Sequence, residues 1–115
     1  PLVELRRARE VVSPGGILLV GVPNVAGLSL RLKSWQSRLG LKSKRWRHYA
    51  ALHHLWFFTP TTLRRLVEAA GFEVIRVETP VMDRPDRSPA LTGVYRGLLE
   101  TCRAASLLDL YARAR

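Results

Sequence analysis

The sequence has little cysteine and no long apolar run. Cys102 is the only cysteine among 115 residues, which excludes an internal disulfide and a cysteine-based metal site. A single thiol is typical of a reducing compartment, so we expect a cytoplasmic protein. The longest apolar run, Ile17 to Val22, is far too short to span a bilayer, and no signal peptide is apparent. The chain begins at Pro1 rather than Met, so we expect a fragment or a processed chain.

Acidic residues are also scarce, and none occurs between Val11 and Val67. The formal net charge is +10, which attracts phosphate, nucleic acid or anionic lipid. An acidic partner, or another part of the same polypeptide, also explains this excess. We favour that explanation because the basic residues form no recognition motif. The apolar content of 47% is sufficient for a core in one small domain or in a piece of a larger one.

The spacing of the apolar residues predicts alternating helices and strands. We expect helices over residues 2–12, 28–39, 60–70 and 94–105, and strands over 17–22 and 72–77. Thr59 is the expected N-cap of the third helix and Pro60 its first residue. The Glu or Gln of a full capping box is replaced there by Thr62. Residues 107–113 fit the periodicity of a strand and that of a helix alike.

Two of these elements have informative apolar patterns. The run from Ile17 to Val22 has no polar face, which predicts a strand covered on both sides, as in parallel sheets between helices. The helix over 28–39 has an apolar stripe that includes Trp35, and we expect this stripe to pack on the core. The order of elements, with crossovers long enough for parallel pairing, predicts an α/β fold.

Three segments resemble, in their order and spacing, the class I S-adenosylmethionine-dependent methyltransferases, especially the small-molecule group. Residues 1–20, with Ser13-Pro14-Gly15-Gly16, are similar to the helix, L-x-P-G-G turn and fifth strand of that fold. Pro23-Asn24 often follows that strand. His54-Leu55-Trp56-Phe57-Phe58-Thr59-Pro60, followed by Ala70-Gly71-Phe72, is similar to the family block that leads into the sixth strand.

The resemblance covers residues 1–77 and implies a particular fold. That fold is a partial Rossmann-like methyltransferase sheet of about three strands, mixed, with flanking helices and an antiparallel last strand. Residues 107–113 would be that last strand, and we choose strand over helix on this ground. The implied organisation is the C-terminal part of a single methyltransferase domain over residues 1–115.

The sequence departs from the family in one important way. The glycine-rich loop and the acidic ribose-binding residue are absent, although glycine lets the backbone approach the cofactor closely. Gly15 and Gly16 belong to a turn before a strand, and Gly21 lies inside one. The resemblance implies S-adenosylmethionine as cofactor, but no residue here is assigned to bind it. We expect a missing N-terminal half, and a chain that is inactive alone.

Ligands of such sheets bind beyond the carboxyl ends of the strands, which places Pro23 and Asn24 at the rim of the pocket as candidate substrate contacts. An ordinary turn role for Asn24 is about equally supported. His54 matches the family histidine and is a candidate base, although a structural role, with its ring bonded to a backbone carbonyl, is favoured. The histidines lack carboxylate or thiolate companions, so no metal site is expected.

Residues 25–53 are the expected insertion that covers the acceptor. Tyr49 is a candidate lining residue, and Arg45 is a candidate contact for an anionic acceptor. A solvated basic loop is an equally supported alternative for Arg45 and its neighbours. The function implied by the resemblance is methyl transfer to a small-molecule or saccharide-type acceptor.

Two non-enzymatic hypotheses remain open. The basic stretch from Arg31 to Arg47, with Trp35 and Trp46, has the composition of a nucleic-acid-binding segment in which aromatic rings stack on bases. Alternatively, the helix over 28–39 would lie on an anionic membrane surface. We rank the membrane hypothesis last, because an apolar stripe in a folded domain more often faces the core.

Overall fold

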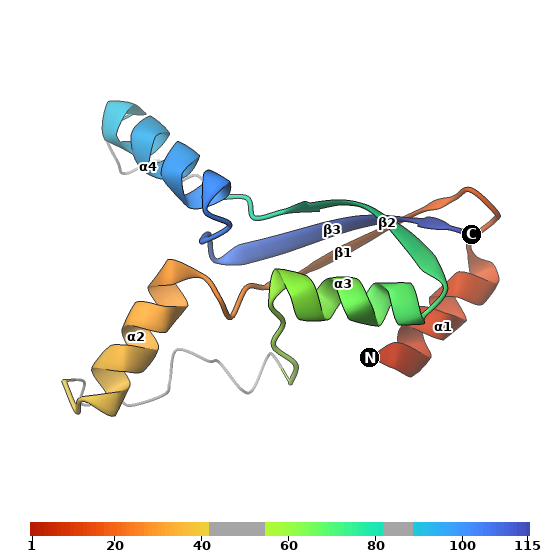
Figure 1. The fold of residues 1–115 in the computed structure, drawn as a ribbon, viewed down its shortest axis with the longest axis horizontal. Helices are drawn as coiled ribbons and strands as arrows, with labels where there is room; N and C mark the ends of the chain where they lie inside the picture. The colour runs from red at the N-terminus through yellow and green to blue at the C-terminus, as the bar shows by residue number, and fades with distance from the viewer. Residues whose placement is uncertain (42–54, 82–88) are drawn as a thin grey trace.

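The computed structural model describes residues 1–41, 55–81 and 89–115 (Figure 1). In chain order its elements are α1 (Leu2–Val11), β1 (Ile17–Pro23), α2 (Leu28–Arg38), α3 (Pro60–Ala69), β2 (Phe72–Glu78), α4 (Pro89–Thr101) and β3 (Leu107–Ala114). The predicted order of helices and strands is confirmed. The ambiguous residues 107–113 belong to a strand, as the resemblance implied.

The last strand lies between the two strands that precede it in the chain. The sheet order is β1-β3-β2, and β3 is antiparallel to both neighbours. The register pairs Val20 with Leu110 on one side and Phe72 with Ala114 on the other, with an irregularity between Val74 and Arg76. Because both neighbours are antiparallel to β3, β1 and β2 run in the same direction and are separated by β3. The antiparallel last strand is therefore confirmed.

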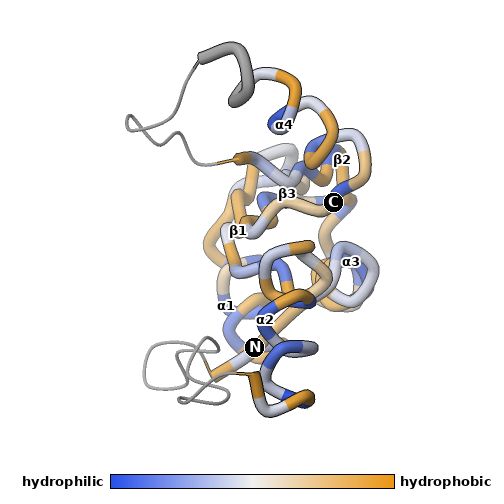
Figure 2. Tube along the Cα trace, turned by 90° about the vertical axis from the view of Figure 1, so that its left-hand side faces the viewer, coloured by the Kyte–Doolittle hydropathy of each residue, from blue (hydrophilic) through white to orange (hydrophobic). Residues whose placement is uncertain are grey.

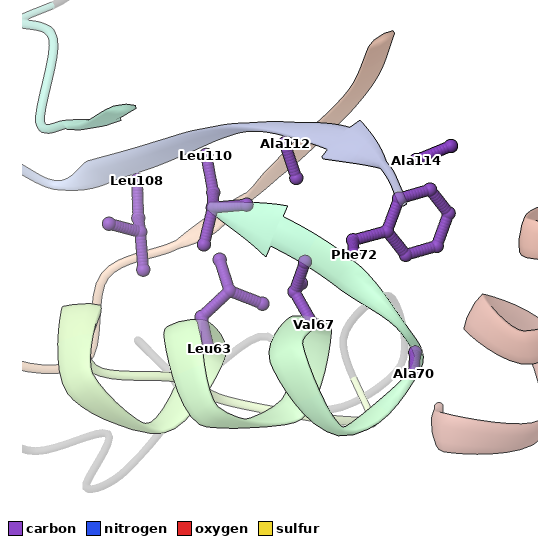
Figure 3. Packing of buried hydrophobic residues seen from close by; sticks show 8 residues of the cluster. All are labelled: Leu63, Val67, Ala70, Phe72, Leu108, Leu110, Ala112 and Ala114. Atoms are coloured by element: carbon purple, nitrogen blue, oxygen red, sulfur yellow. The ribbon is translucent and has the colours of Figure 1, made fainter. Parts of the chain in front are cut away.

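The core lies between one face of this sheet and α3 (Figure 3). Leu63 and Val67 of α3 point toward Leu108 and Leu110 of β3, and all four side chains are fully buried. The cluster of buried residues consists of Leu63, Val67, Ala70, Phe72, Leu108, Leu110, Ala112 and Ala114. Helix α1 packs on the same cluster through Leu2 and Leu5. Burial of each large side chain contributes about 1.5–3 kcal/mol, so this layer carries most of the stability.

The opposite face of the sheet is not covered by the described residues. Ile17 and Leu19 of β1 are each 56% exposed, whereas Leu18 and Val20 pack against the core. The expectation of a strand covered on both sides is therefore wrong for this part of the chain. The apolar sequence of a strand does not show whether helices cover one face of the sheet or both. Here α1 and α3 cover the same face.

Helix α3 begins with a complete capping box, although the sequence lacks the usual Glu or Gln. The Thr59 hydroxyl accepts a hydrogen bond from the Thr62 backbone N–H at 3.2 Å, and Thr62 Oγ1 accepts one from the Thr59 N–H at 2.9 Å. The threonine hydroxyl thus takes the place of the longer side chain, which satisfies two N–H groups at the helix start. The predicted N-cap at Thr59 is confirmed.

Helices α2 and α4 extend past the same end of the sheet (Figure 1). Helices α1, α2 and α3 lie on one side of the sheet and α4 lies on the other, as the turned view also shows (Figure 2). The predicted core packing of α2 is wrong, because Trp35 is 58% exposed. Helix α4 ends at Thr101, earlier than expected, and Val94 and Leu98 on it are exposed.

Candidate functional site at the carboxyl end of β1

The two site residues predicted at the rim of the pocket lie where β1 ends. Pro23 is the last residue of β1, is half-buried and pairs with Leu107 at the start of β3. Asn24 follows and forms an isolated parallel bridge with Phe58, the residue before the α3 cap. This edge therefore brings together three segments that are far apart in the sequence.

The side chain of Asn24 is only 1% exposed and is bound within the chain. Its Nδ2 donates hydrogen bonds to the carbonyl oxygens of Arg103 at 3.1 Å and Ala105 at 2.9 Å. Its Oδ1 accepts one from the Ala26 N–H at 3.1 Å. Both amide hydrogens are thus used, and the described residues provide a donor for only one of the two lone pairs of Oδ1. A substrate contact by Asn24 stays a prediction, limited to accepting a hydrogen bond.

The start of α2 is held against the same connection between α4 and β3. The Leu28 N–H donates to the Ala104 carbonyl at 2.8 Å, and the Gly27 N–H donates to the Asn24 carbonyl at 3.0 Å. A Cβ on Gly27 would lie 2.7 Å from the Ala105 carbonyl oxygen, so only glycine fits without movement. We call residues 24–28, residues 103–106 and Phe58 the junction.

Sequence patterns identified Asn24 but not its partners. The carbonyls that it binds lie 79 and 81 residues away. No local pattern indicates such a pairing, because the partners are backbone atoms available at any residue type. The spacing of Asn24 and Gly27 was the one available signal of a tight polar turn.

Two surface hollows lie close to this edge. One of about 320 Å³ adjoins Val25 and is lined by Arg31, Ser34, Trp35 and Arg38. Two guanidinium groups beside an indole suit an anionic group attached to an apolar body. The other hollow, of about 400 Å³, lies between residues 76–80 and the end of α4. Its lining carries both signs of charge and the buried hydroxyl of Thr79, which has no hydrogen-bond partner among the described residues.

The remaining predicted site residues lie outside the described ranges. They are the candidate base His54 and the candidate substrate contacts Tyr49 and Arg45. The expected insertion over 25–53 is described up to residue 41, which includes α2. The structure therefore places Pro23 and Asn24 at the carboxyl end of β1, and the site roles of all five residues stay predictions.

The glycines of the described residues do not form a cradle for a nucleotide-like cofactor. Gly15 and Gly71 have positive φ angles of 78° and 93°, but they lie in the turns before β1 and β2, at the amino ends of the strands. Gly27 lies beyond the carboxyl end of β1, but the place that its Cβ would take is filled by the Ala105 carbonyl. The described residues therefore do not fit the glycine-rich site that S-adenosylmethionine requires.

Comparisons with known proteins agree with this architecture. A family model described as "Methyltransferase domain" matches residues 1–77, which is more than half of the chain. A solved structure from Thermotoga maritima, described as a SAM-dependent methyltransferase and possible histamine N-methyltransferase, is similar with a TM-score of 0.61 at 16% identity. The alignment covers all of this chain and 49% of that one, so this chain spans about half the length of that protein. No curated protein sequence matches.

The structural likeness shows the fold, and the family match identifies the lineage. The helix, turn, strand and capped helix that carry the sequence resemblance all fall within the matched residues 1–77. On this evidence, the chain belongs to the methyltransferase-domain family.

Proposed function

We propose that this chain forms the acceptor side of an S-adenosylmethionine-dependent methyltransferase that acts on a small-molecule or saccharide-type acceptor. The observation that carries the proposal is the insertion of β3 between β1 and β2, in a chain whose first 77 residues match the methyltransferase-domain family. Family membership supports methyl transfer, and the acceptor class rests on the resemblance to small-molecule methyltransferases.

The cofactor site is proposed to lie outside these 115 residues. The sequence contains no Gly-x-Gly-x-Gly, and Gly15 and Gly71, which have positive φ angles, lie at the amino ends of β1 and β2. We therefore expect the isolated chain to be inactive and the complete polypeptide, in the cytoplasm, to carry the activity.

The chain's own contribution is to hold and shield the acceptor. Methyl transfer depends on alignment of the reacting atoms and on exclusion of water, and needs little acid–base chemistry. Pro23 and the remaining lone pair of Asn24 would lie at the rim, with residues 25–53 as the cover. Arg45 and Tyr49 are proposed acceptor contacts within that cover. His54 is the proposed base where the acceptor must lose a proton.

Calorimetry with S-adenosylmethionine tests whether the cofactor site lies outside these 115 residues. The complete polypeptide that carries these residues should bind the cofactor. The 115-residue chain, shown to be folded by circular dichroism, should give no heat of binding. Cofactor binding by the folded short chain would contradict the proposed location of the site, and no binding by the complete polypeptide would contradict the proposed function.

Transfer of a labelled methyl group to a panel of small-molecule and saccharide acceptors tests the acceptor class. With an acceptor that loses a proton, His54→Gln should lower kcat about 100-fold or more if His54 is the base. A variant with unchanged kcat would remove His54 from that role while leaving methyl transfer itself intact.

A further inference from the structure

Helix α2 presents its apolar side to solvent. Leu28, Leu32, Trp35 and Leu39, which we call the outer stripe, are between 49% and 58% exposed. Ser37, which lies about half a turn from Trp35 and Leu39, is only 1% exposed. At this point of the helix the buried side is therefore polar and the apolar side is exposed, which reverses the usual arrangement of a surface helix.

The outer stripe is accompanied by positive charge. Helix α2 contains Arg31, Lys33 and Arg38 and no acidic residue. Arg31 precedes Trp35 by four residues and Arg38 follows it by three, so both guanidinium groups flank the indole on the helix surface. They line the hollow of about 320 Å³ together with Ser34. None of the ion pairs found in the described part of the chain involves a cation of α2.

We propose that α2 docks on the surface of an anionic lipid bilayer, with the outer stripe toward the acyl chains and Arg31 and Arg38 on headgroup phosphates. Exposed leucines and a tryptophan beside arginines are the features of a helix that lies in the membrane interface. The charge of α2 is complementary to an anionic surface, and guanidinium groups bind phosphate oxygens in pairs. This proposal rests on the exposure and charge of α2 and not on the proposed methyl transfer, although α2 lies within the proposed cover over residues 25–53.

The composition of the outer stripe favours lipid over nucleic acid. Single-stranded nucleic acids are bound by several aromatic rings on which successive bases stack. The outer stripe has one aromatic ring among three leucines, and aliphatic side chains gain most from contact with acyl chains. The described residues include no helix that is long and apolar enough to cross a bilayer. At 11 residues, α2 is about 16 Å long, so it would lie along the surface.

Co-sedimentation of the protein with vesicles tests the proposal. Binding is expected to vesicles of three parts phosphatidylcholine and one part phosphatidylglycerol, to weaken with salt, and to be absent with phosphatidylcholine alone. The double variant Leu32→Ser/Trp35→Ser should weaken binding at least about tenfold. Arg31→Gln and Arg38→Gln should each weaken it about fivefold.

The matched control is Val94→Ser/Leu98→Ser on α4. These two side chains are 71% and 62% exposed, but they lie on the other side of the sheet from α2. The control should bind the vesicles as the unsubstituted protein does, and all variants should unfold at similar urea concentrations. Equal loss in the α4 control would contradict docking through α2.

Tryptophan fluorescence supplies a second measurement. In a Trp46→Phe/Trp56→Phe background, Trp35 is the one remaining tryptophan, and lipid with brominated acyl chains should quench it. Binding without quenching would overturn the proposal. So would salt-dependent binding of a single-stranded oligonucleotide without vesicle binding, or a dimer by light scattering that dissociates when the outer stripe is substituted.

Discussion

The side-chain amide of Asn24 ties the end of β1 to the connection that leads into β3. Asn24→Asp keeps an oxygen for the Ala26 N–H but replaces the Nδ2 donor with a second oxygen, opposite the carbonyls of Arg103 and Ala105. Two hydrogen bonds are lost and a buried charge faces two acceptors. We expect the free energy of unfolding to fall by about 2–4 kcal/mol.

Urea unfolding followed by circular dichroism measures this change. Ser29→Ala is the matched control, because it removes the 2.8 Å hydroxyl bond to Ser106 at the same junction, where the pair is exposed. The control should change stability by less than about 1 kcal/mol. An Asn24→Asp variant as stable as its Ser29→Ala counterpart would show that the amide does not hold the junction.

Glycine at position 27 is required by a neighbouring backbone carbonyl rather than by its own dihedral angles. A Cβ would lie 2.7 Å from the Ala105 oxygen, so Gly27→Ala should destabilise the fold by about 1–3 kcal/mol. Gly97→Ala in α4 is the comparison, because nothing lies within 4 Å of its Cβ position. There alanine should stabilise the helix by up to about 1 kcal/mol. Thermal unfolding of both variants should give shifts of opposite sign, and shifts of the same sign would disprove the crowding at Gly27.

At the scale of single elements, α3 depends on its N-terminal cap. Thr59→Ala removes the hydroxyl that accepts from the Thr62 N–H, and we expect a loss of about 1 kcal/mol in unfolding free energy. Thr61→Ala, at an exposed position in the same turn, should change stability by less than about 0.5 kcal/mol. Chemical denaturation distinguishes the two, and equal stabilities would mean that the capping box contributes nothing.

The sequence predicted the elements well because their signals are local. Threonine followed by proline marked the start of α3, and Gly71 marked its end. The orientation of α2 was missed for a physical reason: spacing shows that Leu28 and Trp35 share a face, but it does not show which face packs. The sequence pattern of the capping box specifies Glu or Gln, whereas the hydroxyl of Thr62 accepts the same hydrogen bond from the Thr59 N–H.

At the scale of the whole molecule, the sheet has one covered face and one face open in the described part of the chain. Leu110→Ala on the covered side leaves a cavity among fully buried side chains and should cost about 2–5 kcal/mol. Leu19→Ala on the open side, at a position that is 56% exposed, should cost less than about 1 kcal/mol. Urea titration of the two variants checks this difference, and similar losses would contradict the assignment of the faces.

Contacts between segments that are far apart in the sequence were the least predictable part of the fold. The family resemblance correctly indicated an antiparallel last strand, whereas periodicity alone left residues 107–113 undecided. The contacts of Asn24 with Arg103 and Ala105 join segments about 80 residues apart, and nothing in either segment indicates the other. The position of Asn24 at the end of β1 was therefore predicted, but its hydrogen bonds were not.

The insertion of β3 between β1 and β2 is tested most directly by cysteine pairs in a Cys102→Ser background. Leu19, Tyr111 and Arg76 form one row across the three strands. Leu19 and Tyr111 are directly paired across β1 and β3. The Ala114 N–H donates to the Gly16 carbonyl, and hydrogen-bonded and non-hydrogen-bonded pairs alternate along antiparallel strands. The pair of Leu19 and Tyr111 is therefore a non-hydrogen-bonded one, with Cα atoms about 4.5 Å apart. Under mild oxidation, Leu19→Cys/Tyr111→Cys should form a disulfide, whereas Leu19→Cys/Arg76→Cys, two strands apart at about 10 Å, should not. A disulfide between positions 19 and 76, with none between 19 and 111, would contradict the strand order on which the methyltransferase fold of this chain depends.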